Sequence, residues 1–109
     1  MKRLYRIRKN EEFSEIINTG KSVADGCFVL YFVKRKQENC RIGISVSKKL
    51  GKAVERNKIK RQVREMLWEL VDFENCLYDY VVIVRKGFLD SDYHNNKNHL
   101  EILIKKAII

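Results

Sequence analysis

The apolar positions of this chain change period along its length, and these changes divide it into helices and strands. Three segments have helical spacing, in which apolar residues return every three or four positions. The first is short, with Asn10 as its cap and Gly20 as its stop. The second starts at Glu55, and the third closes the chain after a polar, loop-like stretch at 87–98. Their apolar faces consist of Phe13, Ile16 and Ile17 in the first, Ile59, Val63, Met66, Leu67 and Leu70 in the second, and Leu100, Leu103, Ile104, Ala107 and Ile108 in the third.

Three further segments have the patterns of β-strands. Residues 27–33 are rich in β-branched and aromatic side chains, and both faces of that strand would be largely apolar. Residues 41–47 alternate, so that Ile42, Ile44 and Val46 face inward. Residues 79–84 form a nearly continuous apolar run, which is typical of a strand buried on both faces. The order α-β-β-α-β-α predicts an α+β fold, built as an α/β sandwich.

Length and composition indicate one domain that spans residues 1–109. The 109 residues are 45% hydrophobic, which suits one modest core, and no proline, linker or internal repeat divides them. Residues 1–9 form a basic arm that we expect to be flexible. The longest apolar runs are far too short to span a membrane, and no apolar signal core follows the basic start. We therefore expect a cytoplasmic protein with no membrane partner.

The three cysteines support a reducing compartment. Cys27, Cys40 and Cys76 are odd in number, widely spaced and form no Cys-x-x-Cys pair. Such cysteines are typical of reduced cytosolic thiols, and Cys27 would lie in the first predicted strand.

Positive charge is concentrated in one central segment. Residues 41–64 contain nine Lys and Arg against a single acid, Glu55, whereas the whole chain has a net charge of +9. A smaller basic cluster occupies the arm at 1–10. Charge segregated in this way is the electrostatic footprint expected of a protein that binds a polyanion.

The basic residues of the second predicted helix lie beside its apolar stripe. At about 100° per residue, Arg56, Asn57, Lys60, Arg61 and Arg64 spread over an adjoining face. Arg offers planar forked donors, Lys a point charge, and Asn both a donor and an acceptor, which suits phosphates and sugar edges. A solvated basic face is the alternative, but acids are almost absent from it, so nucleic-acid binding is favoured.

The same segment carries a family resemblance. The block RNKIKR at 56–61, preceded by SVSKK at 45–49 and GKAV at 51–54, closely resembles the signature of the protein subunit of bacterial ribonuclease P. Lys58 departs from the Arg-Asn-Arg core of that signature; it keeps the charge but loses the bidentate fork. Matches continue outward in the right order to YRIR at 5–8, EF at 12–13, GKS at 20–22, FVLY at 28–31 and YVVIVR at 80–85.

The resemblance implies both a fold and an activity. It adds a short strand, expected near 48–52, and a left-handed βαβ crossover like that in the second domain of a small-subunit ribosomal protein. It implies a ribonucleoprotein endonuclease that removes the 5′ leader of precursor tRNA. One protein would bind each catalytic RNA, which performs the hydrolysis with Mg²⁺, while the protein holds no cofactor and is inactive alone. The catalytic RNA would bind Lys48, Lys49, Lys52, Arg56, Asn57, Lys58, Lys60, Arg61 and Arg64.

The resemblance also implies a groove for the single-stranded leader, lined by Phe13, Ile17 and Tyr31. A sheet face with exposed aromatic rings beside a basic helix is a known way of holding single-stranded RNA. Family members often have a second aromatic residue where this chain has Ile17, which leaves apolar contact in place of stacking. Composition alone favours the core for Phe13 and Tyr31, and it is the resemblance that favours the groove.

No pattern predicts catalysis or metal binding by the protein itself. His94 and His99 lie five positions apart in a polar segment beside Asp92, and we interpret them as solvated loop residues. Trp68 would pack against a neighbouring segment. The alternative function is a plain RNA-binding structural protein, such as a small ribosomal protein or an assembly factor. DNA binding is disfavoured, because no helix-turn-helix pair surrounds the basic helix.

Overall fold

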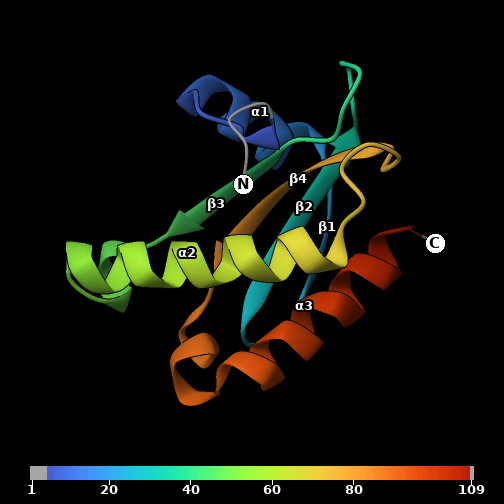
Figure 1. Ribbon diagram of the computed structural model, residues 1–109. Coiled ribbons are helices and arrows are strands. Elements are labelled where there is room, and N and C mark those ends of the chain that lie inside the picture. Colours follow the sequence, from blue (N-terminus) through green and yellow to red (C-terminus); the bar gives the residue numbers. More distant parts are fainter. Residues whose placement is uncertain (1–4, 109) are drawn as a thin grey trace.

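The computed structural model describes residues 5–108, which form a four-stranded sheet with helices on both faces (Figure 1). The mixed α+β class and the single sheet agree with the prediction. In chain order the elements are α1 (Asn10–Thr19), β1 (Lys21–Ala24), β2 (Phe28–Lys34), β3 (Ile42–Val46), the 3₁₀ turn η2 (Lys48–Leu50), α2 (Ala53–Leu70), β4 (Tyr78–Val84), the 3₁₀ turn η3 (Lys86–Asp90) and α3 (Tyr93–Ile108).

The strands lie in the order β1-β2-β4-β3. β2 is antiparallel to both of its neighbours, whereas β3 and β4 are parallel and are joined through α2. In Figure 1, α2 lies in front of the sheet, β3 and β4 run toward the lower left, and β4 lies below β3. This crossover is therefore left-handed, against the strong right-handed rule, as the resemblance implied.

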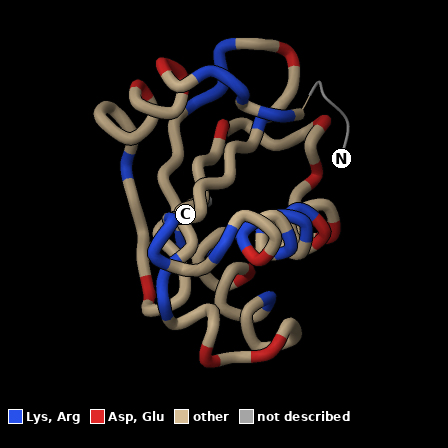
Figure 2. The backbone as a smooth tube through the Cα atoms, turned by 90° about the vertical axis from the view of Figure 1, so that its left-hand side faces the viewer, with Lys and Arg blue, Asp and Glu red and all other residues tan. Residues whose placement is uncertain are grey.

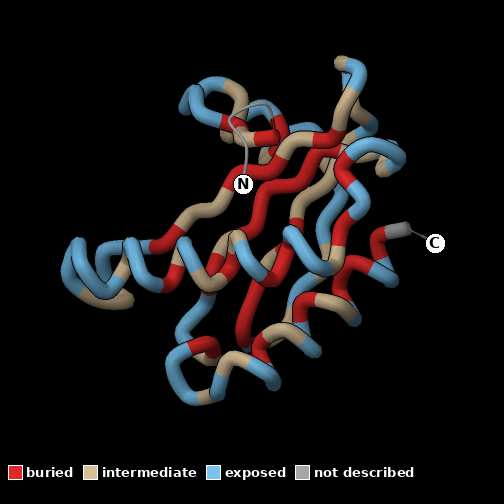
Figure 3. The backbone as a smooth tube through the Cα atoms, in the orientation of Figure 1, coloured by how far each residue is buried: buried red, intermediate tan, exposed pale blue. Residues whose placement is uncertain are grey.

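The two faces of the sheet have separate cores. Alternation along β4 sends Tyr80, Val82 and Val84 to the face that α2 and α3 cover, and Val81 to the face that α1 covers. The larger core is completed by the apolar stripes of the two long helices, which face the sheet (Figure 3). Burial on both sides explains the nearly continuous apolar run that the sequence shows for β4.

The additional strand lies elsewhere than expected. It is β1, whose Ser22 pairs with Tyr31 at the free side of β2, while the predicted position at 48–52 holds the 3₁₀ turn η2. Most of β1 is exposed and polar. Only Val23 of this strand packs against the core, so it has no apolar alternation by which a sequence could reveal it.

The closing helix also begins earlier than the polar stretch 87–98 suggested. Asp92 accepts a hydrogen bond from the Asn95 amide (2.8 Å), which caps α3, and buried Asn96 donates to the Phe88 carbonyl (3.0 Å). His94 and His99 therefore lie on a helix and not in a loop, which corrects the sequence-based interpretation. The first turns of α3 consist of polar residues, some of which make structural hydrogen bonds, so the sequence shows no apolar helical spacing there.

The first residues of α1 and β2 also differ slightly from the prediction. Asn10 is the first helical residue of α1, with Lys9 at the cap position, and Cys27 precedes β2. All three cysteines are free thiols, and Cys27 and Cys40 are buried.

Half of the predicted N-terminal arm is anchored to the sheet. Tyr5 and Ile7 are buried, and the Ile7 amide donates to the Ile42 carbonyl (2.9 Å) beside β3. The remainder of the arm, residues 1–4, lies outside the described residues. Within the described part of the chain, none of the helices combines the length and the apolar character that crossing a membrane requires.

Candidate nucleic-acid interface

A basic surface begins where β3 ends and the chain turns into α2. The Ser47 hydroxyl accepts a hydrogen bond from the Lys49 amide (3.2 Å) and caps η2. Gly51 then has φ 148°, a conformation that side chains with a Cβ rarely adopt, and Glu55 packs against it. This tight turn places Lys48 and Lys49 next to the N-terminal end of α2.

α2 buries one side and presents its cations on the others. Ile59, Val63, Met66 and Leu67 are buried against the sheet, as their spacing predicted. Figure 2 faces the N-terminal end of α2 and shows Lys and Arg along this helix beside those of the preceding turn. Of the predicted RNA-binding residues, Lys48, Lys49, Lys52, Asn57, Lys58 and Arg61 are exposed, and Arg56, Lys60 and Arg64 are half-buried.

These cations are not neutralised by neighbouring acids. Across residues 5–108, the ion pairs involve Lys36, Arg41, Lys97, His99 and Lys105, and none of the basic residues of η2 and α2. A set of cations without carboxylate partners keeps its full attraction for phosphates.

Two residues that the sequence analysis did not assign also belong to this surface. Burial, together with the neighbouring positive charge of Arg6, lowers the pKa of Arg64, which places Arg6 close to the basic face. Val54 is 81% exposed and lies among these cations. The sequence held a clue to each residue. Arg6 belongs to the basic arm, and Val54 lies inside the GKAV block.

Trp68 closes one end of the basic surface. Its ring stacks on Phe73, with centroids 5.6 Å apart, and tilts against Tyr5 at 6.2 Å. The prediction that Trp68 packs against a neighbouring segment is therefore confirmed, although the ring remains 51% exposed.

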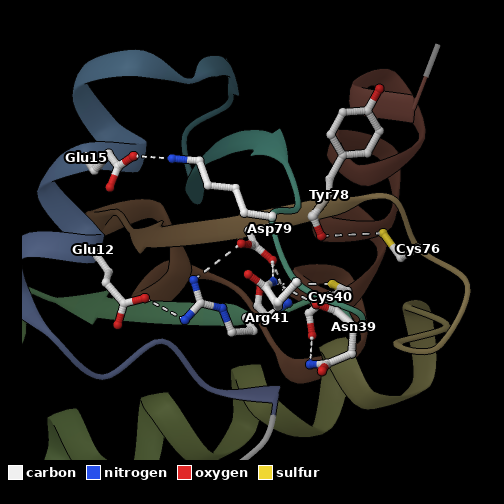
Figure 4. A network of polar contacts seen from close by, with 10 residues as sticks. Glu12, Glu15, Asn39, Cys40, Arg41, Cys76, Tyr78 and Asp79 are labelled. Atoms are coloured by element: carbon white, nitrogen blue, oxygen red, sulfur yellow. Dashed lines mark hydrogen bonds and ion pairs between the residues drawn. The ribbon is translucent and has the colours of Figure 1, made fainter.

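A second candidate surface lies on the opposite face of the sheet, where α1 packs. Arg41 holds α1 in place: its guanidinium pairs with Glu12 (2.5 Å) and with Asp79 (3.5 Å), as Figure 4 shows. Asp79 is buried and also accepts hydrogen bonds from the Arg41 amide (2.9 Å) and the Gln37 side chain (2.8 Å). This network ties the first helix to the ends of β3 and β4.

The three predicted leader-binding residues are brought together on this face. Phe13 and Ile17 project from α1, and Tyr31 lies on β2, where it pairs with Val81. All three predicted residues are partly buried, so none is sealed in the main core. They border the part of the sheet that α1 does not cover, where Ile83 is also partly exposed.

The expectation of aromatic rings beside the basic helix is wrong in one respect. α2 packs over the face that carries Tyr80 and Val82, whereas Tyr31 points to the face that carries α1. The reason is that the apolar stripe of α2 is buried by packing on the more apolar face of the sheet. The cations of α2 and the ring of Tyr31 thus belong to two distinct surfaces.

The similarity to known proteins agrees with this geometry. A sequence model of the family described as Ribonuclease P matches residues 1–108. The chain belongs to the ribonuclease P protein family. Its function is that of the protein component of ribonuclease P, a ribonucleoprotein that processes tRNA, and the alternative of a ribosomal or assembly protein is not favoured.

Individual ribonuclease P relatives support this membership over nearly the whole chain. The ribonuclease P protein component of Listeria welshimeri is 44% identical over 106 residues, which cover 96% of this chain and 89% of the relative. The structure of the Staphylococcus aureus RNase P protein superposes with a TM-score of 0.85 at 44% identity, covering 94% of each chain. That of Thermotoga maritima gives 0.76 at 35% identity, over 90% of this chain and 94% of that one.

A glycine under α1 tests how this ribonuclease P protein holds its first helix on the sheet. A Cβ added to Gly43 would lie 2.6 Å from the Phe13 ring, so Gly43→Ala should displace the ring and α1. We expect the free energy of unfolding to fall by about 1–3 kcal/mol, as for other overpacked sites. Urea unfolding measures this, with Gly26→Ala as the control, because nothing lies within 4 Å of a Cβ there. Equal stability of the two variants would contradict the placement of Phe13.

Proposed function

We propose that this protein holds two RNA segments at once, one on each face of its sheet. The basic residues of η2 and α2 dock on the catalytic RNA of ribonuclease P, one protein per RNA. Phe13, Ile17 and Tyr31 hold the single-stranded 5′ leader of precursor tRNA. The RNA subunit, with Mg²⁺, hydrolyses the phosphodiester bond, and the protein works in the cytoplasm and supplies no cofactor to the reaction.

The observation that carries this proposal is the separation of the two surfaces. Among residues 5–108, no carboxylate pairs with the cations of α2 on one side, and the partly exposed ring of Tyr31 lies on the other. Cations suit the dense phosphates of a folded RNA, whereas an aromatic ring on an open sheet suits unstacked bases. A protein with both surfaces can raise the affinity for precursor tRNA above that for mature tRNA, because only the precursor has a leader.

The test uses the complex of protein and catalytic RNA with two ligands, precursor tRNA and mature tRNA. Tyr31→Ala should weaken precursor binding by about 1–3 kcal/mol, or roughly 5- to 150-fold, since one base loses its stacking partner. Tyr31→Phe should have a smaller effect, because it keeps the stacking plane. Fluorescence anisotropy with labelled tRNA measures each affinity.

Mature tRNA serves as the internal control, since it has nothing to place against Tyr31. Its affinity should be the same for the original protein and for Tyr31→Ala. Thermal melts distinguish the competing role of Tyr31 as a core residue. A large fall in melting temperature, combined with equal losses for both tRNAs, would refute the leader assignment.

A further inference from the structure

A cluster of three potential metal ligands lies apart from both RNA surfaces. The carboxylate of Asp25, the thiol of Cys27 and the imidazole of His99 all lie within 4.8 Å of one another. Asp25 and Cys27 come from the turn between β1 and β2, and His99 comes from α3, 74 positions after Asp25. The tertiary structure alone brings them together.

The turn between β1 and β2 fixes Asp25 with one oxygen toward the cluster. Asp25 Oδ1 accepts hydrogen bonds from the backbone amides of Cys27 (2.8 Å) and Phe28 (2.9 Å). The other oxygen, Oδ2, lies 3.0 Å from Nδ1 of His99. A ligating carboxylate is commonly oriented in this way by hydrogen bonds to its second oxygen.

The backbone around Cys27 is held equally firmly. The Arg85 amide donates to the Cys27 carbonyl (2.8 Å), the Arg85 side chain to the Asp25 carbonyl (3.0 Å), and the Gly87 amide to the Gly26 carbonyl (3.0 Å). Gly87 passes so close that a Cβ there would lie 2.3 Å from the Gly26 oxygen. The thiol is buried, with only 6% of the residue exposed. Two of the three ligands are therefore preorganised.

We propose that Asp25, Cys27 and His99 bind a zinc ion, with water as the fourth ligand. Thiolate, imidazole and carboxylate are the three side-chain ligands that Zn²⁺ takes in proteins, whereas Mg²⁺ and Ca²⁺ prefer oxygen alone. Tetrahedral zinc with bonds of about 2.0–2.3 Å spaces its ligand atoms roughly 3.3–3.8 Å apart. A shift of roughly 1 Å brings the widest pair of ligand atoms in this cluster to that spacing.

The ion would join two segments that are distant along the chain. It would replace the direct contact between Asp25 and His99 and connect the start of β2 to α3. On binding zinc, the Cys27 thiol would release its proton to solvent, as thiol ligands do. A ligand bound only by the folded protein raises its stability, and this site would therefore stabilise the domain.

The alternative is that these residues have only a structural role, as an ion pair and a hydrogen-bonded turn. In that case Asp25 orders the turn, His99 pairs with Asp25, and Cys27 fills space in the core. This reading predicts no selective affinity for a metal. A measurement of metal affinity therefore distinguishes the two roles without any assay of RNA processing.

The experiment titrates the full-length protein with Co²⁺ and then Zn²⁺, in a phosphine reductant that does not chelate metals. Co²⁺ bound through Cys27 should give thiolate charge-transfer absorption and the intense visible bands of a tetrahedral site, and one equivalent of Zn²⁺ should abolish both. Zn²⁺ should also raise the melting temperature. His99→Ala should weaken zinc binding more than about 100-fold, since the loss of outer-shell partners alone costs 10- to 100-fold.

Matched controls exist for two of the ligands. His94→Ala removes an exposed histidine from the same helix, and Cys76→Ser removes a thiol outside the cluster; both should bind metal like the original protein. Cys27→Ser should remove the charge-transfer band. Cobalt spectra without that band would overturn the proposal, as would zinc affinity unchanged by His99→Ala. Loss of folding in Cys27→Ser would leave His99→Ala to decide, because His99 is 47% exposed in its side chain.

Discussion

Protein freed completely of RNA should not cleave precursor tRNA, and addition of the cognate RNA with Mg²⁺ should restore removal of the leader. The physical reason is that neither of the two proposed RNA surfaces carries groups for hydrolysis. The proposed leader side consists of Phe13, Ile17 and Tyr31, which can stack or pack but cannot activate water. The nearby carboxylates of Glu12 and Asp79 are paired with Arg41. The cations of α2 can bind phosphates, but no carboxylate pairs with them among the described residues. Gel analysis of 5′-labelled precursor measures cleavage with and without the RNA.

Two controls make this result informative. Nuclease treatment of the protein, followed by repurification, excludes a copurified catalytic RNA. His99→Ala in the reconstituted enzyme should cleave as the original protein does, since the Asp25, Cys27 and His99 cluster belongs to neither RNA surface. Rapid cleavage at the correct site by RNA-free protein would place catalysis in the protein and contradict the proposed division of labour.

The second large effect is expected from the basic helix. Replacement of Arg56, Lys60 and Arg61 by Ala should weaken binding to the catalytic RNA strongly at low salt. Each lost phosphate contact should also reduce the slope of log affinity against log salt by roughly one unit. The fold should persist, because Ile59 and Val63 make the buried contacts of this part of α2. Filter binding over a range of salt concentrations, with circular dichroism, measures both.

A variant with the same change in net charge separates local contacts from overall electrostatics. Lys86, Lys105 and Lys106 are exposed and lie outside the basic surface, on η3 and α3. Their replacement by Ala should leave the salt slope close to that of the original protein. If the salt slope falls equally in both triple variants, the change in net charge explains the effect. The assignment of α2 as the docking surface would then be wrong.

The sequence by itself determined those features that rest on local periodicity and charge. Ile59, Val63, Met66 and Leu67 recur at helical spacing, and all are buried in α2. The apolar run of β4 indicated a strand with two covered faces, because successive side chains of a strand point to opposite faces of the sheet. The segregation of cations into residues 41–64 indicated a polyanion partner, and this needs no tertiary contacts.

Only the tertiary structure decided the features that depend on distant segments. β1 is short, mostly exposed and defined by its pairing with β2, and the first turns of α3 are fixed by Asp92 and Asn96. The placement of Tyr31 and the cations of α2 on opposite faces follows from which side of the sheet the stripe of α2 covers. His99 looked solvated because its partners, Asp25 and Cys27, are more than 70 positions away, and chain folding alone brings their ligand atoms within 4.8 Å.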